Sequence, residues 1–447
     1  MSSVLKYSSL LIFVLLLQSG LSLFAQEKNL YFYYDSLTYA QYNQENWSGL
    51  IKSSRKAFKN DIDYYYLRMR AGIANYESGN YLLAERQFKK ALKMNNIDPV
   101  SKEYIYYSKL FAGKDKEASL FYGRNREYLE NKLNSKNKAV RSFMFDLAYH
   151  FNFEDKPGVL FNLEKFYTVP GNQTVTRNFF YGSFLLQHDI SRYFILTHGG
   201  SLLRKYNYYF SASPELILDS YEHRINQNQY YVSLGFYPGA DFNINASLHY
   251  INLVSPSIVY RQRGFGTIYS IPGLNENYWL SRISAYKYFH LFRIGAGVSW
   301  SDLNNNEQLQ KDAHLIFYPL GNRNLYTTSS FYHITETGSL KKTHHPVFQQ
   351  GVGFKVLDNL WVESKFLTGE LKNAATGEGF VIYNGNETVT SRLDLNLIIP
   401  DEKFTLSINS SYLEYYSSFV DPEGNVTSFN DLKFKGLTLI AEIKWNF

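Results

Sequence analysis

The chain has 447 residues, a formal net charge of +6 and no cysteine. The lack of cysteine excludes disulfides, thiolate metal sites and thiol nucleophiles, and the small net charge does not indicate nucleic-acid binding. Aromatic residues make up 18% of the chain, with 40 Tyr and 34 Phe. This is typical of proteins that place aromatic girdles at the two interfaces of a membrane.

Residues 1–26 have the pattern of a secretory signal peptide. Lys6 is the only charge in this stretch, an apolar run follows from Leu10 to Leu17, and the sequence Leu-Phe-Ala at 23–25 ends in a small residue. The apolar run is shorter than the about 20 residues that a membrane-spanning helix needs. We expect the mature chain to begin near Gln26; the alternative is a retained anchor.

Residues 39–127 repeat with a step of 34, a period typical of stacked helical hairpins. In the clearest copy, 71–92, the residues for close helix approach, for the turn and for filling the space between helices are Gly72, Gly79, Tyr81, Ala84, Phe88 and Ala91. This copy resembles a tetratricopeptide repeat. We therefore expect residues 27–137 to form about three such repeats that bind a periplasmic protein or polymer. The alternative is a helical spacer that binds nothing.

From residue 138 the hydrophobic period changes from 3.6 to 2, as strands 142–153 and 292–300 illustrate. Six short and seven long connections join about fourteen strands (12–16), and the alternation of short and long connections is typical of outer-membrane barrels. The long connections are expected at 154–173, 208–228, 254–275, 302–309, 337–344, 371–386 and 418–430. The sequence thus predicts an α+β multidomain protein, with an antiparallel transmembrane β-barrel over 138–447. A soluble β-sandwich is the alternative, although its strands would be shorter.

The C-terminal strand indicates the membrane. One of its faces is apolar and ends in an aromatic residue, and this face carries the expected barrel-assembly signal: Leu439, Ile443, Trp445 and Phe447. Such a strand needs lipid on one side and a polar lumen on the other. We therefore expect the cell outer membrane as the location, its lipid and the barrel assembly machinery as partners, and the N-terminal domain in the periplasm.

Charged residues of mixed sign fall on the presumed lumenal face of the strands: Arg293, Glu363, Lys365, Arg392, Asp394, Glu442 and Lys444. We expect them to form ion pairs across the lumen. A fourteen-strand barrel lies between the filled eight-strand kind and the open porins, so its lumen is either open or plugged by a loop or by side chains.

The sequence shows no convincing catalytic or cofactor-binding motif. Ser247 and His249 share one strand face, but the sequence places no acid beside them to orient the histidine. The adjacent His344 and His345 are two donors without a neighbouring carboxylate, which favours a solvated loop over a metal site. No catalytic residue, metal ligand or cofactor is therefore predicted.

The order of signal peptide, short repeat region and C-terminal barrel resembles the YaiO-like outer-membrane family. Exopolysaccharide export barrels and surface-lipoprotein assembly proteins have a similar order. The resemblance implies a non-enzymatic protein for export or assembly of a surface polysaccharide or protein. The alternatives are a passive or gated small-solute channel, or a barrel enzyme acting on lipid or glycan.

Overall fold

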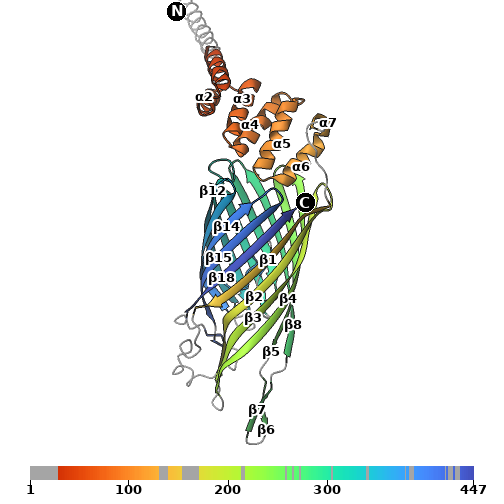
Figure 1. The fold of residues 1–447 in the computed structure, drawn as a ribbon, viewed down its shortest axis with the longest axis vertical. Coiled ribbons are helices and arrows are strands. Elements are labelled where there is room, and N and C mark those ends of the chain that lie inside the picture. The colour runs from red at the N-terminus through yellow and green to blue at the C-terminus, as the bar shows by residue number, and fades with distance from the viewer. Residues whose placement is uncertain are drawn as a thin grey trace, which may run out of the picture. The chain divides into compact units, whose positions relative to one another are not determined.

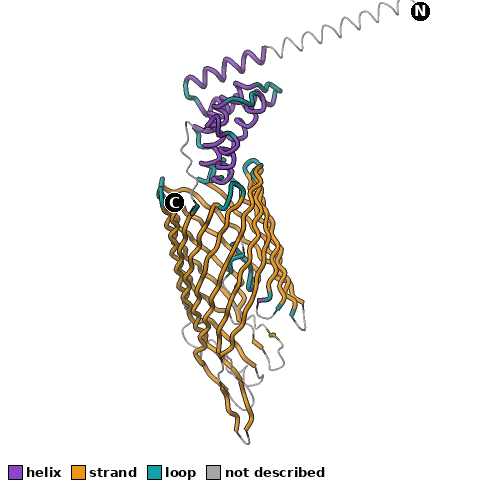
Figure 2. Tube along the Cα trace, turned by 90° about the vertical axis from the view of Figure 1, so that its right-hand side faces the viewer, coloured by secondary structure: helices purple, strands orange, loops and turns teal. Residues whose placement is uncertain are grey.

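The chain folds into two compact units, a helical unit and a β-barrel (Figures 1 and 2). The computed structural model describes residues 29–129, 139–153, 171–212, 217–256, 259–263, 266–270, 273–303, 306–338, 342–377, 379–381, 387–417, 419–420, 426–427 and 433–447. The predicted signal peptide lies outside the described residues.

The helical unit consists of antiparallel helices joined by short turns. They are the helical residues 29–43, α2 (Trp47–Lys59), α3 (Tyr65–Glu77), α4 (Tyr81–Met94), α5 (Pro99–Phe111), α6 (Asp115–Arg124) and α7 (Arg126–Leu129). The first residues of α2, α4 and α6 are 34 positions apart, as are those of α3 and α5, so the sequence period is also a structural one. Among the described helices, none has the length and apolar character needed to cross a membrane.

The contact between α3 and α4 explains the pattern of small and bulky residues. A Cβ atom on Gly72 would lie 2.6 Å from the Phe88 ring, so only glycine lets the two helices approach this closely. Gly79 turns the chain between them with φ +73°. Phe88, Ala84 and Ala91 are buried in one cluster with residues of the next helix. The assignment to the tetratricopeptide family stays a prediction.

Fourteen antiparallel strands close into a barrel, as the sequence predicts. They are β1 (Val140–Asn152), β2 (Gly171–Asp189), β3 (Phe194–Ala212), β4 (Ile217–Gly239), β5 (Phe242–Pro256), β8 (Gly273–Phe289), β9 (Phe292–Ser301), β10 (Glu307–Phe317), β11 (Leu325–Thr337), β12 (Lys342–Leu357), β13 (Leu360–Leu371), β14 (Glu387–Pro400), β15 (Phe404–Ser417) and β18 (Lys433–Asn446). β1 pairs with both β2 and β18, which leaves the sheet without a free edge.

Four short strands extend the long-connection end of the barrel. The pair β6 (Val259–Arg263) and β7 (Gly266–Ser270) forms a hairpin between β5 and β8. β16 (Phe419–Val420) pairs with the start of β2 and with β17 (Val426–Thr427). Beyond the ends of β1 and β18, β2 therefore continues against the segment that follows β15.

The largest departure from the predicted loops is at 208–228. There β3 and β4 stay paired from Phe194 opposite Phe236 to Ala212 opposite Ile217, so most of the predicted loop is strand. Its residues are rich in Tyr, Asn and charged side chains, which reads as a loop when each residue is judged alone. Backbone hydrogen bonds between two paired strands form with polar side chains as well as with apolar ones. The length of each strand is therefore decided by its partner strand.

The two faces of the barrel differ in the way the alternation predicts. Large apolar side chains on the outer face are exposed on strands around the whole circumference, including Phe145, Leu234, Ile283, Phe348 and Leu395. Polar side chains on the inner face are buried, including Ser201, Gln229, Arg282, Asp312 and Asp394. The barrel thus has an apolar exterior and a polar interior.

Candidate functional site: a lumenal segment and its cavities

The described part of the connection between β13 and β14 folds into the barrel. We call its described residues, 372–377 and 379–381, the lumenal segment; it includes the teal stretch seen between the strands in Figure 2. Ala374 is buried in an apolar cluster with residues of β11, β12 and β15. Ala375 and Val381 are buried in another cluster with residues of β5 and β8. The segment therefore contacts walls on opposite sides of the lumen.

Side chains of β10 hold the backbone of the lumenal segment. The Gln310 amide accepts a hydrogen bond from Ala375 N at 2.9 Å and donates one to Ala375 O at 2.8 Å. Gln308 Nε2 donates to Lys372 O at 3.0 Å. Glutamine at both positions presents a peptide-like group to the segment, so the wall binds it as a neighbouring strand would.

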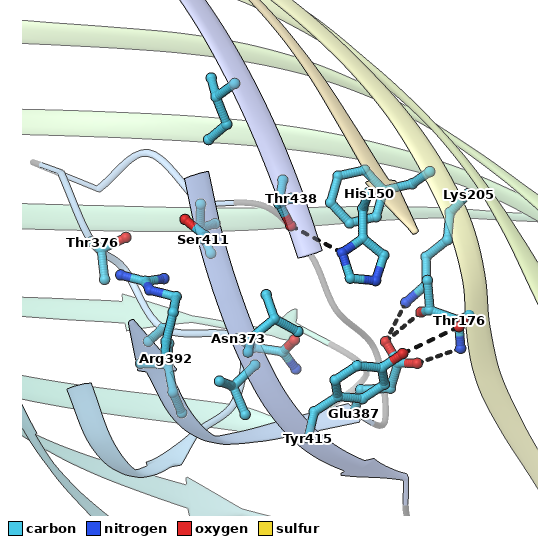
Figure 3. A pocket seen from close by; sticks show the side chains of 17 residues that line it. His150, Thr176, Lys205, Asn373, Thr376, Glu387, Arg392, Ser411, Tyr415 and Thr438 are labelled. Carbon is cyan, nitrogen blue, oxygen red and sulfur yellow. Dashed lines mark hydrogen bonds and ion pairs between the residues drawn. The ribbon is translucent and has the colours of Figure 1, made fainter. Parts of the chain in front are cut away.

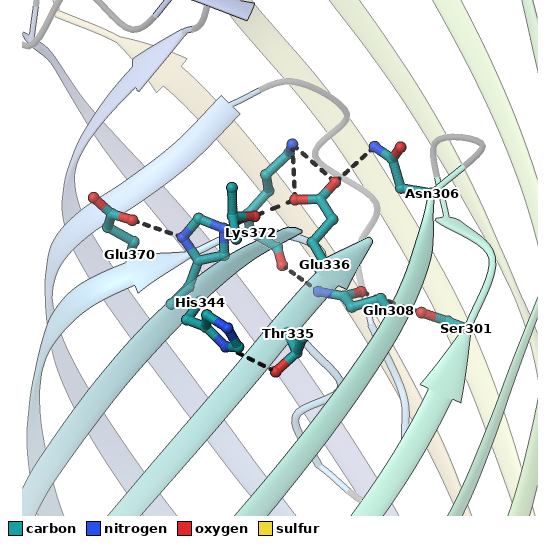
Figure 4. Close-up of polar contacts among 10 residues, drawn as sticks. Ser301, Asn306, Gln308, Thr335, Glu336, His344, Glu370 and Lys372 are labelled. Carbon is teal, nitrogen blue, oxygen red and sulfur yellow. Dashed lines mark hydrogen bonds and ion pairs between the residues drawn. The ribbon is translucent and has the colours of Figure 1, made fainter. Parts of the chain in front are cut away.

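An ion pair reinforces this anchor near the end of β11 (Figure 4). Lys372 Nζ lies 3.2 Å from Glu336 Oε1, and Asn306 Nδ2 donates to the same oxygen at 2.7 Å. Both charged side chains are largely buried. The first residue of the lumenal segment is thereby tied to the wall by charge as well as by hydrogen bonds.

The last residues of the lumenal segment contact the opposite wall. The Phe380 ring stacks on His249 with centroids 5.4 Å apart and planes 9° apart. The rings of Tyr231 and Tyr181 meet the Phe380 ring edge-on, with centroid-to-centroid distances of 5.9 and 6.1 Å. His249 Nδ1 lies 3.3 Å from Gly379 O. Residues of β2, β4 and β5 thus enclose one aromatic side chain of the segment.

A cavity of about 180 Å³ lies beside the lumenal segment (Figure 3). Its apolar lining includes Leu371, Ala374 and Val381, and its polar lining includes the groups described next. Such a cavity has room for a few water molecules or part of a small solute.

Buried polar groups at this cavity join β14 to β2 and β3. Glu387 accepts hydrogen bonds from Thr176 N at 2.5 Å and Thr176 Oγ1 at 2.6 Å, and Lys205 Nζ lies 2.7 Å from the same carboxylate. His150 Nδ1 is 2.9 Å from Thr438 Oγ1. The contacts of Glu387 fix the start of β14, and the contact of His150 with Thr438 joins β1 to β18.

A second cavity, of about 290 Å³, is lined by residues of β14, β15 and β18. Arg392, Ser411 and Ile440 line both cavities. From there the second cavity follows Asp394 and Asn396 toward the end of β14 that joins the short turn to β15. The two cavities together mark a polar route along one wall. The lumenal segment borders the first cavity, near the start of β14.

The predicted lumenal charges lie on the inner face, but they pair along strands. Lys365 Nζ is 2.7 Å from Glu363, and Arg392 Nε is 3.1 Å from Asp394, each two residues away on the same strand. Arg293 lies over the Tyr286 ring at 4.3 Å. The expected pairing across the lumen is wrong for these two pairs, because neighbours on one strand face are closer than the opposite wall.

Glu442 and Lys444 point to the inner face of β18. Glu442 pairs in register with Asp146 of β1, so two carboxylates stand side by side there. On the other face of this strand, the side chains of Leu439, Ile443, Trp445 and Phe447 are exposed. The role of these four residues in assembly stays a prediction.

A buried two-contact ion pair on the inner face was not predicted. Arg282 of β8 and Asp312 of β10 meet through two contacts, at 2.6 and 2.7 Å. Asp312 also accepts from His314 and Gln310 at 2.8 and 2.9 Å. The alternation of apolar and polar residues places Arg282 and Asp312 on the inner face. That the two meet depends on how β8 and β10 are each paired with β9, which the alternation does not specify.

His344 and His345 belong to β12 and not to a loop. Because adjacent strand residues point to opposite faces, His344 contacts His333 at 3.2 Å, while His345 contacts Glu370 at 2.6 Å. They cannot bind one ion together in this geometry. Within the described residues, no group of three or more His, Asp or Glu is placed to hold a metal.

Comparisons with known proteins give likenesses of fold only. No family model matches the chain, and no curated protein matches it. The toluene transporter TbuX of Ralstonia pickettii is 8% identical with a TM-score of 0.43, covering 69% of this chain and 90% of that chain. A FadL homologue of Pseudomonas aeruginosa is 10% identical with a TM-score of 0.43, covering 76% and 94%.

A bacterial polysaccharide outer membrane secretin is 9% identical with a TM-score of 0.36, covering 70% of this chain and all of that chain. At identities and TM-scores this low, none of these likenesses carries an argument about function. The predicted YaiO-like relationship stays a prediction.

Proposed function

We propose that the barrel spans a bacterial outer membrane. The support is its exterior, where apolar and aromatic side chains are exposed on strand after strand; Ile283 is 64% exposed and Trp300 46%. An apolar surface that encircles a closed barrel is stable only in contact with lipid. Short and long connections at opposite ends support a periplasmic location for the short turns and the helical unit.

We propose that the protein is a gated channel for hydrophilic solutes and that the lumenal segment is its gate. The single observation that supports this most is the pairing of Ala375 with Gln310, because it holds a connecting segment inside the lumen by contacts that can be broken individually. The two cavities along this wall are lined in part by Asn, Ser, Thr and charged groups of both signs. Such a lining favours polar solutes and weak ion selectivity.

Opening requires the loss of a small number of contacts. Three hydrogen bonds and one ion pair hold the Lys372 end, and a hydrogen bond of this kind contributes about 0.5–1.5 kcal/mol net. Burial of Ala374, Ala375 and Val381 adds to this. The total is a few kcal/mol, which is the range in which a ligand or a voltage shifts a two-state equilibrium.

A cross-linking experiment tests the gate. Because the natural chain has no cysteine, Gln310→Cys with Ala375→Cys introduces the only two thiols. A short bifunctional methanethiosulfonate reagent should keep conductance in planar bilayers low, and reduction should restore the openings of the uncross-linked variant. Ser329→Cys with Gln350→Cys, a pair on the outer face, is the matched control and should not respond. Equal conductance before and after cross-linking of the first pair would contradict the proposal.

A second candidate is passage of a polymer or protein cargo, with the helical unit as the docking domain. The observation that favours it is the exposure of large side chains on this unit, including Phe32, Tyr39, Tyr66 and Ile97. Exposed apolar patches on stacked helices are suited to partner binding. If gating stays unchanged after deletion of 27–136 but cargo is lost from the cell surface, this candidate is supported.

We propose no catalytic step. Ser247 and His249 lie on one face of β5, and His249 Nδ1 contacts the Gly379 carbonyl instead of an orienting carboxylate. A histidine held in this way lacks the acid that a nucleophile–base pair needs. Turnover of a lipid or glycan that is lost in His249→Ala would contradict this proposal.

A further inference from the structure

The Phe380 side chain occupies an aromatic site on the inner wall of β2, β4 and β5. His249 lies flat against the ring, and Tyr181 and Tyr231 meet it edge-on. The three wall residues are buried, and Tyr231 and His249 are direct partners in the sheet. The wall therefore presents a rigid enclosure for one six-membered ring, and the lumenal segment supplies the ring that fills it.

Buried amide groups flank this enclosure. Gln229 lies two residues before Tyr231 on the same strand face, and Gln227 pairs with Leu203, the register partner of Tyr181. Gln227 is 1% and Gln229 6% exposed. Among the described residues, neither amide oxygen and neither amide nitrogen has a hydrogen-bond partner. Buried amides of this kind are costly unless something pairs with them.

His249 adds one more group that needs a partner. Its Nδ1 faces a carbonyl oxygen, Gly379 O, and must therefore carry the proton, so Nε2 is an acceptor. Nε2 is buried and has no partner among the described residues. The site thus offers two amide donors, two amide acceptors and one imidazole acceptor, with aromatic faces and no charged group among these residues.

We propose that this wall is a binding site for a neutral sugar in the pyranose form, and that Phe380 occupies it in the closed channel. A pyranose has about the size of a phenyl ring, its C–H face stacks on aromatic rings, and its hydroxyls are both donors and acceptors. The uncharged lining does not favour an ionic ligand. The inference rests on the proposed function, since it names the solute class of the same gate.

Binding and gating are coupled in this arrangement. A sugar and Phe380 compete for the same enclosure, so a bound sugar favours the state in which the end of the lumenal segment has left the wall. Only molecules in which Phe380 has left the enclosure can bind the sugar. The apparent association constant is therefore the intrinsic one multiplied by the fraction of such molecules. Removal of the phenyl group should therefore raise affinity without any new contact.

Calorimetric titration of the purified full-length protein with maltotriose and with cellotriose tests the site. We expect Phe380→Ala to bind at least one of them about tenfold more tightly than the natural protein, as for a site occupied by Phe380 in nine of ten molecules. Gln229→Leu, in the Phe380→Ala background, should lose the binding. Phe331→Ala, which removes a phenyl group from the outer face, is the control and should leave affinity unchanged.

Three outcomes would overturn the inference. They are no binding of either sugar to Phe380→Ala, unchanged binding in Gln229→Leu, and tighter binding of p-cresol than of either sugar. Heat-modifiable migration on gels shows that each variant is folded. The cross-linking experiment distinguishes this inference from the proposed function. Gated conductance without sugar binding would support the channel and reject the sugar site. Sugar binding without gated conductance would support the site and reject the gate.

Discussion

Gln310 binds Ala375 through both groups of its side-chain amide, at 2.8 and 2.9 Å. The two residues belong to β10 and to the lumenal segment, which are separated by three strands of the chain. A side chain that imitates the edge of a strand thus holds a connecting segment inside the barrel. The contact is specific in geometry and small in energy, as a gate requires.

Loss of this contact should increase the open fraction of the channel. Gln310→Ala with Glu336→Gln removes the amide pair and the charge opposite Lys372, a loss of about 2–4 kcal/mol from the closed state. We expect longer and more frequent openings in planar bilayers than for the natural protein. Gln350→Ala on the outer face should leave the openings unchanged, and equal open fractions in all three proteins would argue against the gate.

Glu85 should be essential for the stability of the helical unit. Its buried carboxylate lies within 2.6–2.8 Å of Lys89, Lys109 and Lys114, and the last two are buried as well. Glu85→Ala removes the buried carboxylate that both of these buried ammonium groups contact, which costs about 3–5 kcal/mol. Chemical denaturation followed by circular dichroism on residues 27–136 should show this loss. Glu77→Ala, at an exposed carboxylate at the end of α3, is the comparison, and it should unfold close to the natural fragment.

Gly72→Ala should destabilise the same unit by overpacking. The added methyl would lie 2.6–2.8 Å from carbons of the Phe88 ring, and a forced shift of this kind costs about 1–3 kcal/mol. Phe88→Leu should be destabilising alone but should recover part of the loss in the double variant. If the midpoint shift of the double variant equals the sum of the shifts of the two single variants, Gly72 and Phe88 are not energetically coupled and the prediction is wrong.

Acid should destabilise α5 through Asp98. Burial raises the pKa of Asp98, but hydrogen bonds from Ser101, Tyr65 and Val100 outweigh it and the pKa lies below its ordinary value of 3.8. A lowered folded-state pKa means that the stabilisation is present above pH 3.8 and is lost as pH falls through the folded-state pKa. Thermal unfolding should therefore show a steeper loss below pH 4 in the natural protein than in Asp98→Asn, which keeps an N-cap. Parallel curves would contradict this.

Deletion of Phe447 should reduce assembly of the barrel. The residue ends the outer face of β18, the strand that closes the sheet against β1, and such a terminal strand is the expected signal for barrel assembly. The measurement is the fraction of chain recovered in the outer membrane with heat-modifiable migration. Phe404→Ala is a useful control, since it removes a neighbouring aromatic residue from β15 and leaves the C-terminus intact. Equal recovery of all three proteins would reject the signal.

The sequence by itself determined the change from a helical region to a barrel, an approximate strand number of about fourteen (12–16), and the face on which each side chain of a strand lies. A period of 34 places α2, α4 and α6, and a period of two places Phe145 outside and Asp146 inside. These are local properties, because the backbone repeat decides the direction of each side chain.

Tertiary structure alone decided which inner residues meet and what fills the lumen. Arg282 finds Asp312 only through the register of three strands, and β3 and β4 extend because each is the other's partner. The segment between β13 and β14 reads as an ordinary loop of small and polar residues. Its inward course depends on Gln310, Glu336 and His249, which are distant in the chain, so no local pattern contains it.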